Sequence, residues 1–228
     1  MDARPAFAHG AKGRLTHHDL GRFPSSSLFD RVGRAVCAAG CLPRKELYEA
    51  WEVARRTRRR FRGGPVVDVA AGHGLLAHLM LLLDDTSPTA MALDREPPPS
   101  AHLLHETLVS AWPRLAGRIT IARGTLHDVP LDGGNVIVSS HACGALTDDV
   151  LDAAVRVRAR VAVLPCCQDV EASDTGGLTG WLDGPLAVDV VRVHRLREQR
   201  YRVWTQTIPE AITPKNRLLL GAPVEHAG

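Results

Sequence analysis

The chain has 228 residues, of which 45% are hydrophobic and 4% aromatic, and its formal net charge is +3. This length suits one domain with an extension, and the small net charge excludes a strongly basic or acidic protein. The longest apolar run, from Leu75 to Leu83, is interrupted by His78 and is too short to cross a membrane, so no membrane partner is expected. The start of the chain lacks an apolar signal region, and five cysteines indicate a reducing compartment, so we expect a cytoplasmic protein.

The first part of the chain predicts a helical N-terminal extension over residues 1–62. Residues 1–24 are polar and are expected to lie loosely on the surface. A run of serines then offers N-caps for an apolar-periodic helix at 28–39, which Gly40 would end. A second helix would begin at Pro43 and continue into a segment rich in arginine.

That segment, from Arg55 to Arg62, holds six arginines in eight residues. Such a run can contact phosphates, which would fit a nucleic-acid partner. It can equally be the solvated face of a helix, as basic runs commonly are. The sequence leaves both interpretations open.

From residue 65 onward, short apolar runs alternate with helical patterns. Such runs are typical of strands that are buried on both faces of a parallel sheet. Over residues 63–228 the sequence therefore predicts an α/β, Rossmann-like fold with a seven-stranded, mostly parallel sheet whose last strand is antiparallel. The expected strands are 65–69, 90–93, 118–122, 135–139, 160–164, 201–208 and 217–221, and the expected helices are 75–83, 100–115, 147–158 and 188–199.

The stretch from Val66 to Ala77 is the most informative in the chain. It reads as a buried strand with Asp68 near its end, a turn containing Gly72 and Gly74, and then a helix. This is the arrangement of a nucleotide-type cofactor site in a doubly wound fold. Twenty residues after Gly74, the next strand ends in Asp94, whose carboxylate is placed to accept hydrogen bonds from a ribose diol.

Two cofactors fit such a turn, a dinucleotide and S-adenosylmethionine. A dinucleotide needs helix N–H groups to hold its pyrophosphate, and the spacing Gly72-x-Gly74-x-x-Ala77 matches that loose pattern. S-adenosylmethionine has no phosphate and needs close backbone approach to its sulfonium and a carboxylate for its amino group. Asp68 suits an ammonium or a sulfonium and would repel a pyrophosphate, so we expect S-adenosylmethionine to be the cofactor.

Four reactive side chains follow the fourth and fifth expected strands. His141 and Cys143 come after the fourth strand, and Cys166 and Cys167 come after the fifth. Because ligands in such sheets bind beyond the carboxyl ends of the strands, these side chains should surround the methyl acceptor.

The segment from His141 to Asp148, with the later pair Cys166-Cys167, resembles one group of class I methyltransferases. This group has a His-x-Cys-Gly-x-x-(Ser/Thr)-Asp segment and a later Cys-Cys-His, and it includes the eukaryotic tRNA acceptor-stem 2′-O-ribose methyltransferase and bacterial relatives. The resemblance covers about residues 63–169 and implies an S-adenosylmethionine-dependent methyltransferase domain with a possible RNA acceptor, tRNA or rRNA. The chain departs from the pattern at Gln168, where the group has His, and at Ala70, which replaces the first glycine of the turn and is tolerable if its φ is negative.

Roles for these residues follow from the chemistry of methyl transfer. We expect the cofactor to be bound by Asp68, Gly72, Gly74 and Asp94, with Ala70 in the turn and with Asp128 meeting the adenine amino group. His141 is expected to orient or deprotonate the acceptor, or else to cap a helix or fill a turn.

The cysteines at 143, 166 and 167 have three interpretations. They can be small packing residues, they can line the acceptor pocket or act as a nucleophile, or they can bind a metal with His141. No second Cys-x-x-Cys pair supports a closed zinc site, so no metal is expected. Alternatives to an RNA acceptor are a small molecule, a protein side chain, or a regulatory protein that binds the cofactor without catalysis.

Overall fold

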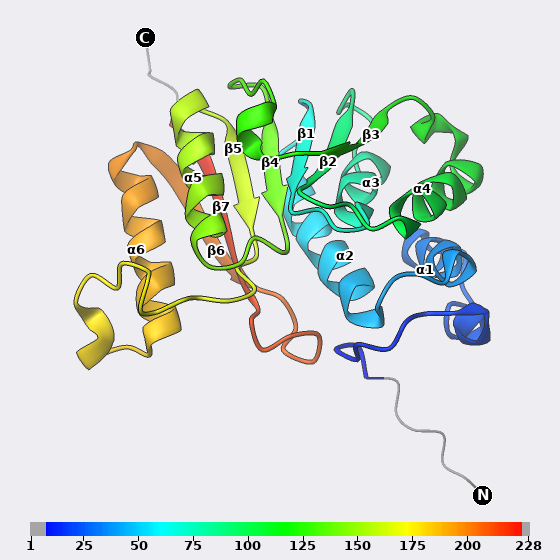
Figure 1. The fold of residues 1–228 in the computed structure, drawn as a ribbon, viewed down its shortest axis with the longest axis horizontal. Helices are drawn as coiled ribbons and strands as arrows, with labels where there is room; N and C mark the ends of the chain where they lie inside the picture. Colours follow the sequence, from blue (N-terminus) through cyan, green and yellow to red (C-terminus); the bar gives the residue numbers. More distant parts are fainter. Residues whose placement is uncertain (1–7, 225–228) are drawn as a thin grey trace, which may run out of the picture.

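The computed structural model describes residues 8–224, and its centre is one seven-stranded sheet. The strands lie in the order β3-β2-β1-β4-β5-β7-β6 (Figure 1). The first five strands pair in parallel, whereas β7 runs antiparallel to both β5 and β6. The strands are β1 (Val66–Val69), β2 (Ala90–Asp94), β3 (Ile119–Arg123), β4 (Val136–Ser139), β5 (Arg160–Val163), β6 (Tyr201–Thr207) and β7 (Arg217–Pro223). This confirms the predicted fold class.

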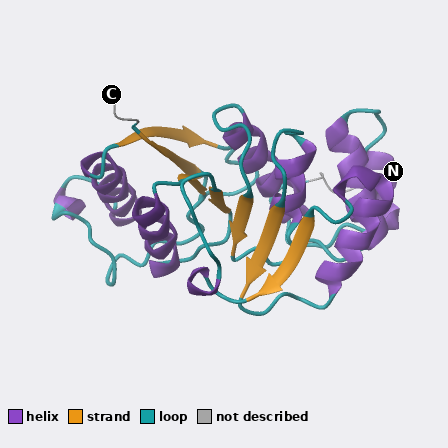
Figure 2. Ribbon diagram, turned by 90° about the horizontal axis from the view of Figure 1, so that it is seen from above, coloured by secondary structure: helices purple, strands orange, loops and turns teal. Residues whose placement is uncertain are grey.

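Helices cover both faces of the sheet (Figure 2). The α-helices are α1 (Leu28–Ala39), α2 (Arg44–Arg58), α3 (Leu75–Leu82), α4 (Ser100–Ala111), α5 (Ala145–Val157) and α6 (Gly184–Glu198). Short 3-10 helices are η1 (His17–Arg22), η2 (Pro113–Leu115), η3 (Leu126–Asp128) and η4 (Leu178–Gly180). None of the helices in the described part of the chain is long and apolar enough to cross a membrane.

The alternation of side chains along each strand divides the core in two. Val66 of β1 and Val136 of β4 pack with residues of α1 to α4 in one cluster. Their neighbours Val67 and Ile137 point to the other face and pack with residues of α5 and α6. Both faces of these strands are therefore buried, as their continuous apolar sequence predicts.

Residues 8–24 are mostly exposed, as expected, but two of their side chains anchor them in this core. Leu15 and Phe23 are 0% and 1% exposed, and Arg14 forms a β-bridge with Pro43. The expectation that residues 1–24 are loosely held is therefore wrong for the part that the structure describes. Helices α1 and α2 pack on α4 and α3 and share one apolar cluster with the sheet.

Local signals account for most of the helix ends. The Ser27 hydroxyl accepts a hydrogen bond from the Asp30 N–H at the start of α1, and Gly40 ends that helix with a left-handed φ of 66°. The helix expected at 100–115 is broken, because α4 ends at Ala111 and Pro113 starts the separate turn η2.

Candidate active site at the carboxyl edge of the sheet

The turn after β1 brings the backbone into an unusual conformation. Gly72 and Gly74 have φ values of 53° and 76°, and a side chain at Gly74 would place its Cβ 2.8 Å from the Ala92 Cβ. Ala70 has a φ of 54°, so the condition under which alanine is readily tolerated in place of glycine, a negative φ, is not met. The turn keeps its left-handed residue even where alanine replaces glycine, which costs backbone energy that glycine would avoid.

Asp94 stands opposite this turn at the end of β2. One carboxylate oxygen accepts a hydrogen bond from the Gly72 N–H at 2.8 Å, and the other accepts from the Glu96 N–H at 2.9 Å. A carboxylate offers about four lone-pair sites, so two N–H donors leave capacity for further hydroxyl donors. Asp94 is half-buried and its side chain lines a cavity.

That cavity has a volume of about 320 Å³ and lies beyond the carboxyl ends of β1, β2 and β4. Its walls come from the turn after β1, the end of β2, the segment after β3 and the loop after β4. The residues that line it are Val69, Ala70, Leu93, Asp94, Arg95, Gly124, Thr125, Leu126, His127, His141, Cys143, Leu146 and Asp149. Its size falls at the lower end of the range for small-ligand sites.

Asp68 does not line this cavity. Its side chain is 1% exposed, and one carboxylate oxygen accepts a hydrogen bond from the Ala77 N–H near the start of α3 at 3.1 Å. Burial raises the pKa of Asp68 well above its ordinary value, and the neighbouring Asp94 carboxylate raises it further. The residue holds the turn and the helix together, and its expected contact with the cofactor stays a prediction.

Asp128 also does not line the cavity, and its carboxylate is bound by neighbouring groups of the chain. Its carboxylate accepts hydrogen bonds from the Thr125 N–H at 2.7 Å and the Thr125 hydroxyl at 2.8 Å, which closes the capping box of η3. These hydrogen bonds lower the pKa of Asp128 below its ordinary value. Its neighbours Thr125 and His127 line the cavity instead, so a contact from this segment to adenine would use them first.

The loop after β4 carries His141 to the cavity and is held firmly at its base. The Ser139 hydroxyl donates to the Val69 carbonyl at 2.6 Å and accepts from the Ala142 N–H at 2.9 Å. The Thr147 hydroxyl donates to the Ala142 carbonyl at 2.6 Å. These bonds join the ends of β1 and β4 and fix the backbone on which the His141 side chain stands.

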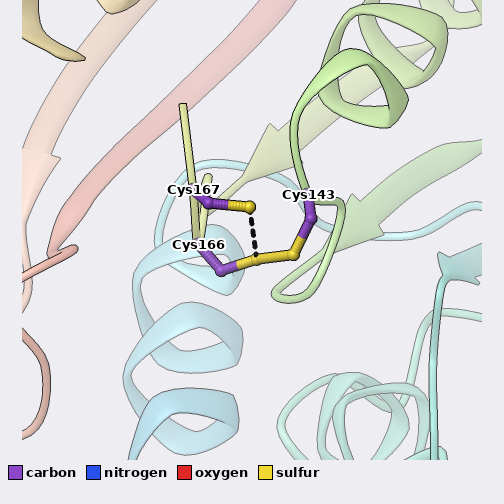
Figure 3. A group of neighbouring side chains, drawn as sticks. All are labelled: Cys143, Cys166 and Cys167. Carbon is purple, nitrogen blue, oxygen red and sulfur yellow. Dashed lines mark hydrogen bonds between the residues drawn. A yellow bond between two sulfur atoms is a disulfide. The ribbon is translucent and has the colours of Figure 1, made fainter. Parts of the chain in front are cut away.

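The three cysteines that follow β4 and β5 gather at one point (Figure 3). Cys143 and Cys166 form a disulfide, and the Cys167 sulfur lies 3.9 Å from that of Cys166. Cys143 and Cys167 are exposed and Cys166 is half-buried, so the interpretation of these residues as core packing is wrong. The three sulfurs lie within 4.8 Å of one another, so the expectation that no metal binds here stays a prediction.

Solved structures with the same fold exist at low sequence identity. An O-methyltransferase family protein from Burkholderia thailandensis matches 93% of this chain with a TM-score of 0.53 and 16% identity. The tRNA methyltransferase TrmK of B. subtilis matches 76% with a TM-score of 0.52 and 15% identity, and the S-adenosylmethionine-dependent methyltransferase SibL matches 93% with a TM-score of 0.51 and 15% identity. The chain spans 64%, 66% and 67% of the lengths of these three proteins. No protein-family model and no curated protein sequence matches the chain.

The chain has the class I methyltransferase fold. In this fold the turn after β1 and the acid that ends β2 lie on one side of the carboxyl edge. The loops after β4 and β5, with His141 and the cysteines, lie on the other.

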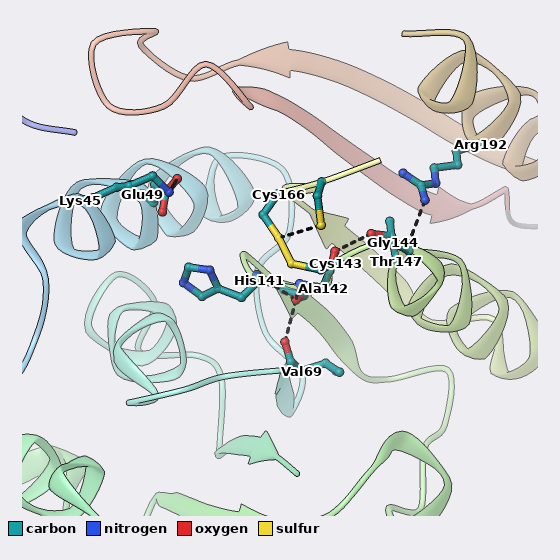
Figure 4. The surroundings of a disulfide bond; sticks show 12 residues. Lys45, Glu49, Val69, His141, Ala142, Cys143, Gly144, Thr147, Cys166 and Arg192 are labelled. Carbon is teal, nitrogen blue, oxygen red and sulfur yellow. Dashed lines mark hydrogen bonds and ion pairs between the residues drawn. A yellow bond between two sulfur atoms is a disulfide. The ribbon is translucent and has the colours of Figure 1, made fainter. Parts of the chain in front are cut away.

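Helix α2 contributes two residues to the second side that the sequence reasoning missed. Figure 4 places Lys45 and Glu49 beside the disulfide and His141. Glu49 is 2% exposed, and one of its oxygens binds the Lys45 ammonium at 2.5 Å. Its other oxygen, Oε2, has no hydrogen-bond partner among residues 8–224. In the sequence this pair reads as an ordinary i, i+4 ion pair on a solvated helix, and only the fold brings it to the site.

The arginine run lies at the opposite edge of the sheet, because residues 59–65 lead directly into the start of β1. Most of its guanidinium groups contact the chain itself. Arg55 and Arg56 bind Glu52, Arg60 lies over the Trp204 ring, and Arg62 donates to the Leu83 carbonyl.

Arg58 is the most buried arginine of the run, at 2% exposed. Its guanidinium donates to the Met80 carbonyl, the Phe61 carbonyl and the Ser87 hydroxyl, and it forms an ion pair with Asp84. The interpretation of this run as a solvated helix face is therefore wrong for Arg58.

Proposed function

We propose that the protein is an S-adenosylmethionine-dependent methyltransferase. The observation that carries this proposal is the hydrogen bond between Asp94 and the turn with left-handed residues at Ala70, Gly72 and Gly74, beside one cavity at the carboxyl edge. The similarity to methyltransferases of known structure supports the same conclusion at the level of the fold. When bound, S-adenosylmethionine supplies a methyl group on a positively charged sulfur.

The residues present fit this cofactor better than a dinucleotide. Asp94 keeps lone pairs for a ribose diol after binding the Gly72 and Glu96 N–H groups. The Gly72 N–H is already used by Asp94, and the Gly74 N–H donates to the Ala71 carbonyl at 2.7 Å, so neither is open to a pyrophosphate. Gly74 also lets the turn pack against Ala92 without a side chain between them.

We assign His141 the task of holding the acceptor. His141 lines the side of the cavity opposite Asp94, on a loop that Ser139 and Thr147 hold in place. An imidazole nitrogen can accept a proton from a hydroxyl acceptor, which must lose that proton as the methyl group arrives. Glu49 offers a carboxylate oxygen without a partner among the described residues on the same side of the carboxyl edge as His141, beside the disulfide.

A small-molecule acceptor is the second half of the proposal. The N-terminal segment lies against the loop between β6 and β7, since a side chain at Gly10 would meet the Ile212 carbonyl at 2.6 Å. The start of α2 is joined to the same segment by the hydrogen bond from the Lys45 N–H to the Ala11 carbonyl. These contacts hold the N-terminal segment between α2 and the loop from β6 to β7, which leaves less open surface near the start of α2 and favours a compact acceptor. The arginine run lies at the other edge of the sheet and gives no support to an RNA acceptor.

The first experiment is a calorimetric titration of the full chain with S-adenosylmethionine, with NADH as the control ligand. Wild-type protein is expected to bind S-adenosylmethionine and not NADH. Asp94→Ala and Asp94→Asn should lose most of that affinity, whereas Glu106→Ala, which removes an exposed acid from α4, should keep it. Binding of NADH, or full binding by both Asp94 variants, would overturn the assignment of the cofactor.

The second experiment follows a labelled methyl group from S-adenosylmethionine into separated pools of metabolites, RNA and protein. We expect label in the metabolite pool, and we expect His141→Gln to lower the transfer rate while leaving the affinity for the cofactor unchanged. Label in the RNA pool would contradict the small-molecule acceptor. Cofactor binding without transfer to any pool would favour the regulatory alternative.

A further inference from the structure

The three cysteines at the acceptor side differ in their chemical states. Cys143 and Cys166 share a disulfide, while Cys167 is a free and exposed thiol 3.9 Å from the Cys166 sulfur. All three sulfurs lie within 4.8 Å of one another, so Cys143 is also within reach of Cys167 (Figure 3). A thiolate close to a disulfide is the arrangement that disulfide exchange requires.

The two loops that carry these residues are joined by other bonds as well. The Gly144 N–H donates to the Cys167 carbonyl at 3.2 Å. The Gly144 carbonyl accepts a hydrogen bond from the Arg192 guanidinium at 3.2 Å. Asp189 links the other loop to the same guanidinium, because it accepts a hydrogen bond from the Gln168 amide and forms an ion pair with Arg192. Because Arg192 is 1% exposed, this network holds the loops from beneath. The sulfurs therefore stay close together when the disulfide opens.

We propose that Cys143, Cys166 and Cys167 form a thiol–disulfide exchange site in which Cys143 pairs alternately with Cys166 and Cys167. In the exchange, the Cys167 thiolate attacks the Cys143 sulfur, a Cys143–Cys167 bond forms, the Cys143–Cys166 bond breaks, and Cys166 leaves as the thiolate. No electrons are gained or lost in that step. A dithiol reductant opens the site fully: it reduces the protein disulfide to two thiols and is itself oxidised to a disulfide.

The other two cysteines provide an internal contrast. Cys37 and Cys41 are buried in the apolar cluster under α1. Burial raises the pKa of Cys37 to about 11 and raises that of Cys41 above its ordinary value. They therefore stay protonated near neutral pH and take no part in exchange. Exchange is expected only at the three cysteines after β4 and β5.

Exchange at this site would act on the acceptor side of the proposed enzyme. His141 precedes Cys143 by two residues, and the disulfide ties its loop to the segment after β5. Opening the disulfide or moving it by one residue changes how that loop is held. This consequence rests on the proposed function, whereas the exchange itself does not.

The exchange is tested in the full chain by rapid alkylation at low pH followed by peptide mass spectrometry that distinguishes Cys166 from Cys167. In wild-type protein, label is expected at both residues, because either can be the free thiol. Oxidised Cys166→Ser should form a Cys143–Cys167 disulfide and so show no reactive thiol in the native state. Label at Cys167 alone in wild-type protein, or free Cys143 and Cys167 in oxidised Cys166→Ser, would overturn the proposal.

A matched control and a second readout complete the experiment. Cys37→Ser is expected to leave the pattern of labelling unchanged. Treatment of the native wild-type protein with a dithiol should raise the number of reactive thiols from one to three, because Cys143 and Cys166 join Cys167 while the buried pair stays protected. A count that stays at one would contradict a reversible disulfide. A missing response to S-adenosylmethionine would refute the proposed function while leaving these thiol counts as they are.

Discussion

Ala70 adopts a backbone conformation that normally belongs to glycine. A left-handed φ brings the alanine Cβ close to its own backbone, at a cost of about 1–2 kcal/mol relative to glycine. Glycine loses more conformational freedom on folding, which offsets part of this difference. The residue therefore stores a modest strain at the wall of the proposed cofactor cavity.

Ala70→Gly is expected to raise the free energy of unfolding by about 0.5–1 kcal/mol, because the relief of strain exceeds the added chain entropy. Urea denaturation measures the change. Ala38→Gly is the matched control, since Ala38 is exposed on α1 and the same substitution there should lower stability by about 1 kcal/mol. Equal losses in the two variants would show that the turn at Ala70 is unstrained.

The sequence predicted the residues of the cavity better than their conformations. Asp94 and His141 line the cavity as predicted, because a strand that ends in or is followed by a polar residue is a local pattern. The burial of Asp68, the φ of Ala70 and the Cys143–Cys166 bond depend on where distant segments meet. Spacing along the sequence does not reveal contacts between distant segments. The position of Glu49 beside the disulfide could not be predicted for the same reason.

Helices α3 and α4 meet through a pair of histidines. His78 is 0% exposed, and its ring contacts the Gly74 carbonyl at 2.7 Å and the His105 ring at 3.0 Å. Burial lowers the pKa of His78 from 6.5 to about 4. Its partner His105 also has a lowered pKa, because of burial and the nearby His102.

This pair predicts a loss of stability in mild acid. The folded pKa of His78 lies below its unfolded value, so the unfolded chain takes up the proton first. The neutral histidine therefore contributes its full stability above pH 6.5, and the contribution falls as the pH drops toward 4, by about 3 kcal/mol at most. Thermal unfolding between pH 7 and pH 4 should show a flatter profile for His78→Leu than for wild type. His18→Gln, at an exposed position, should follow the wild-type profile, and a wild-type profile as flat as that of His78→Leu would contradict the prediction.

The ends of helices were harder to predict than the strands. Strand bounds follow the short apolar runs to within about two residues, most directly in β1 and β4, where every residue is buried. Helix α6 starts at Gly184, earlier than the expected 188, because Asp183 caps it and Pro185 fits its first turn. That start signal is present in the sequence, but it stands among glycines that also indicate a loop.

At the scale of the whole molecule, the arginine run joins α2 to the rest of the fold. Arg58 is buried with Asp84 and donates to three further groups, whereas its neighbour Arg59 is exposed. Arg58→Met should lower the free energy of unfolding by about 3 kcal/mol, because it removes the buried ion-pair partner of Asp84 and leaves that carboxylate only the longer ion pair with exposed Arg62. Arg59→Met should change it by less than about 0.5 kcal/mol. Urea denaturation of the two variants distinguishes a structural run from a solvated one, since equal small effects would contradict the structural role.

Residues 8–62 share one apolar cluster with the sheet. They cover α3 and α4, whose apolar residues Leu79, Met80, Leu104 and Leu108 are all 0% exposed. A chain of residues 63–228 alone would expose this surface and is expected to lose cooperative thermal unfolding, as followed by circular dichroism. Addition of the separate 1–62 peptide should restore some structure, and a cooperative transition in 63–228 alone would show an independent domain.

Helix α2 carries residues with two different roles on two of its faces. Leu47, Ala50 and Val53 fill the core, while Lys45 and Glu49 stand beside the disulfide. Substitutions at 45 and 49 act mainly on the surroundings of the disulfide, whereas substitutions at 47, 50 and 53 act on the core that holds the sheet. In the proposed methyltransferase, preference for one acceptor over another can therefore change through these two positions while the architecture is inherited unchanged.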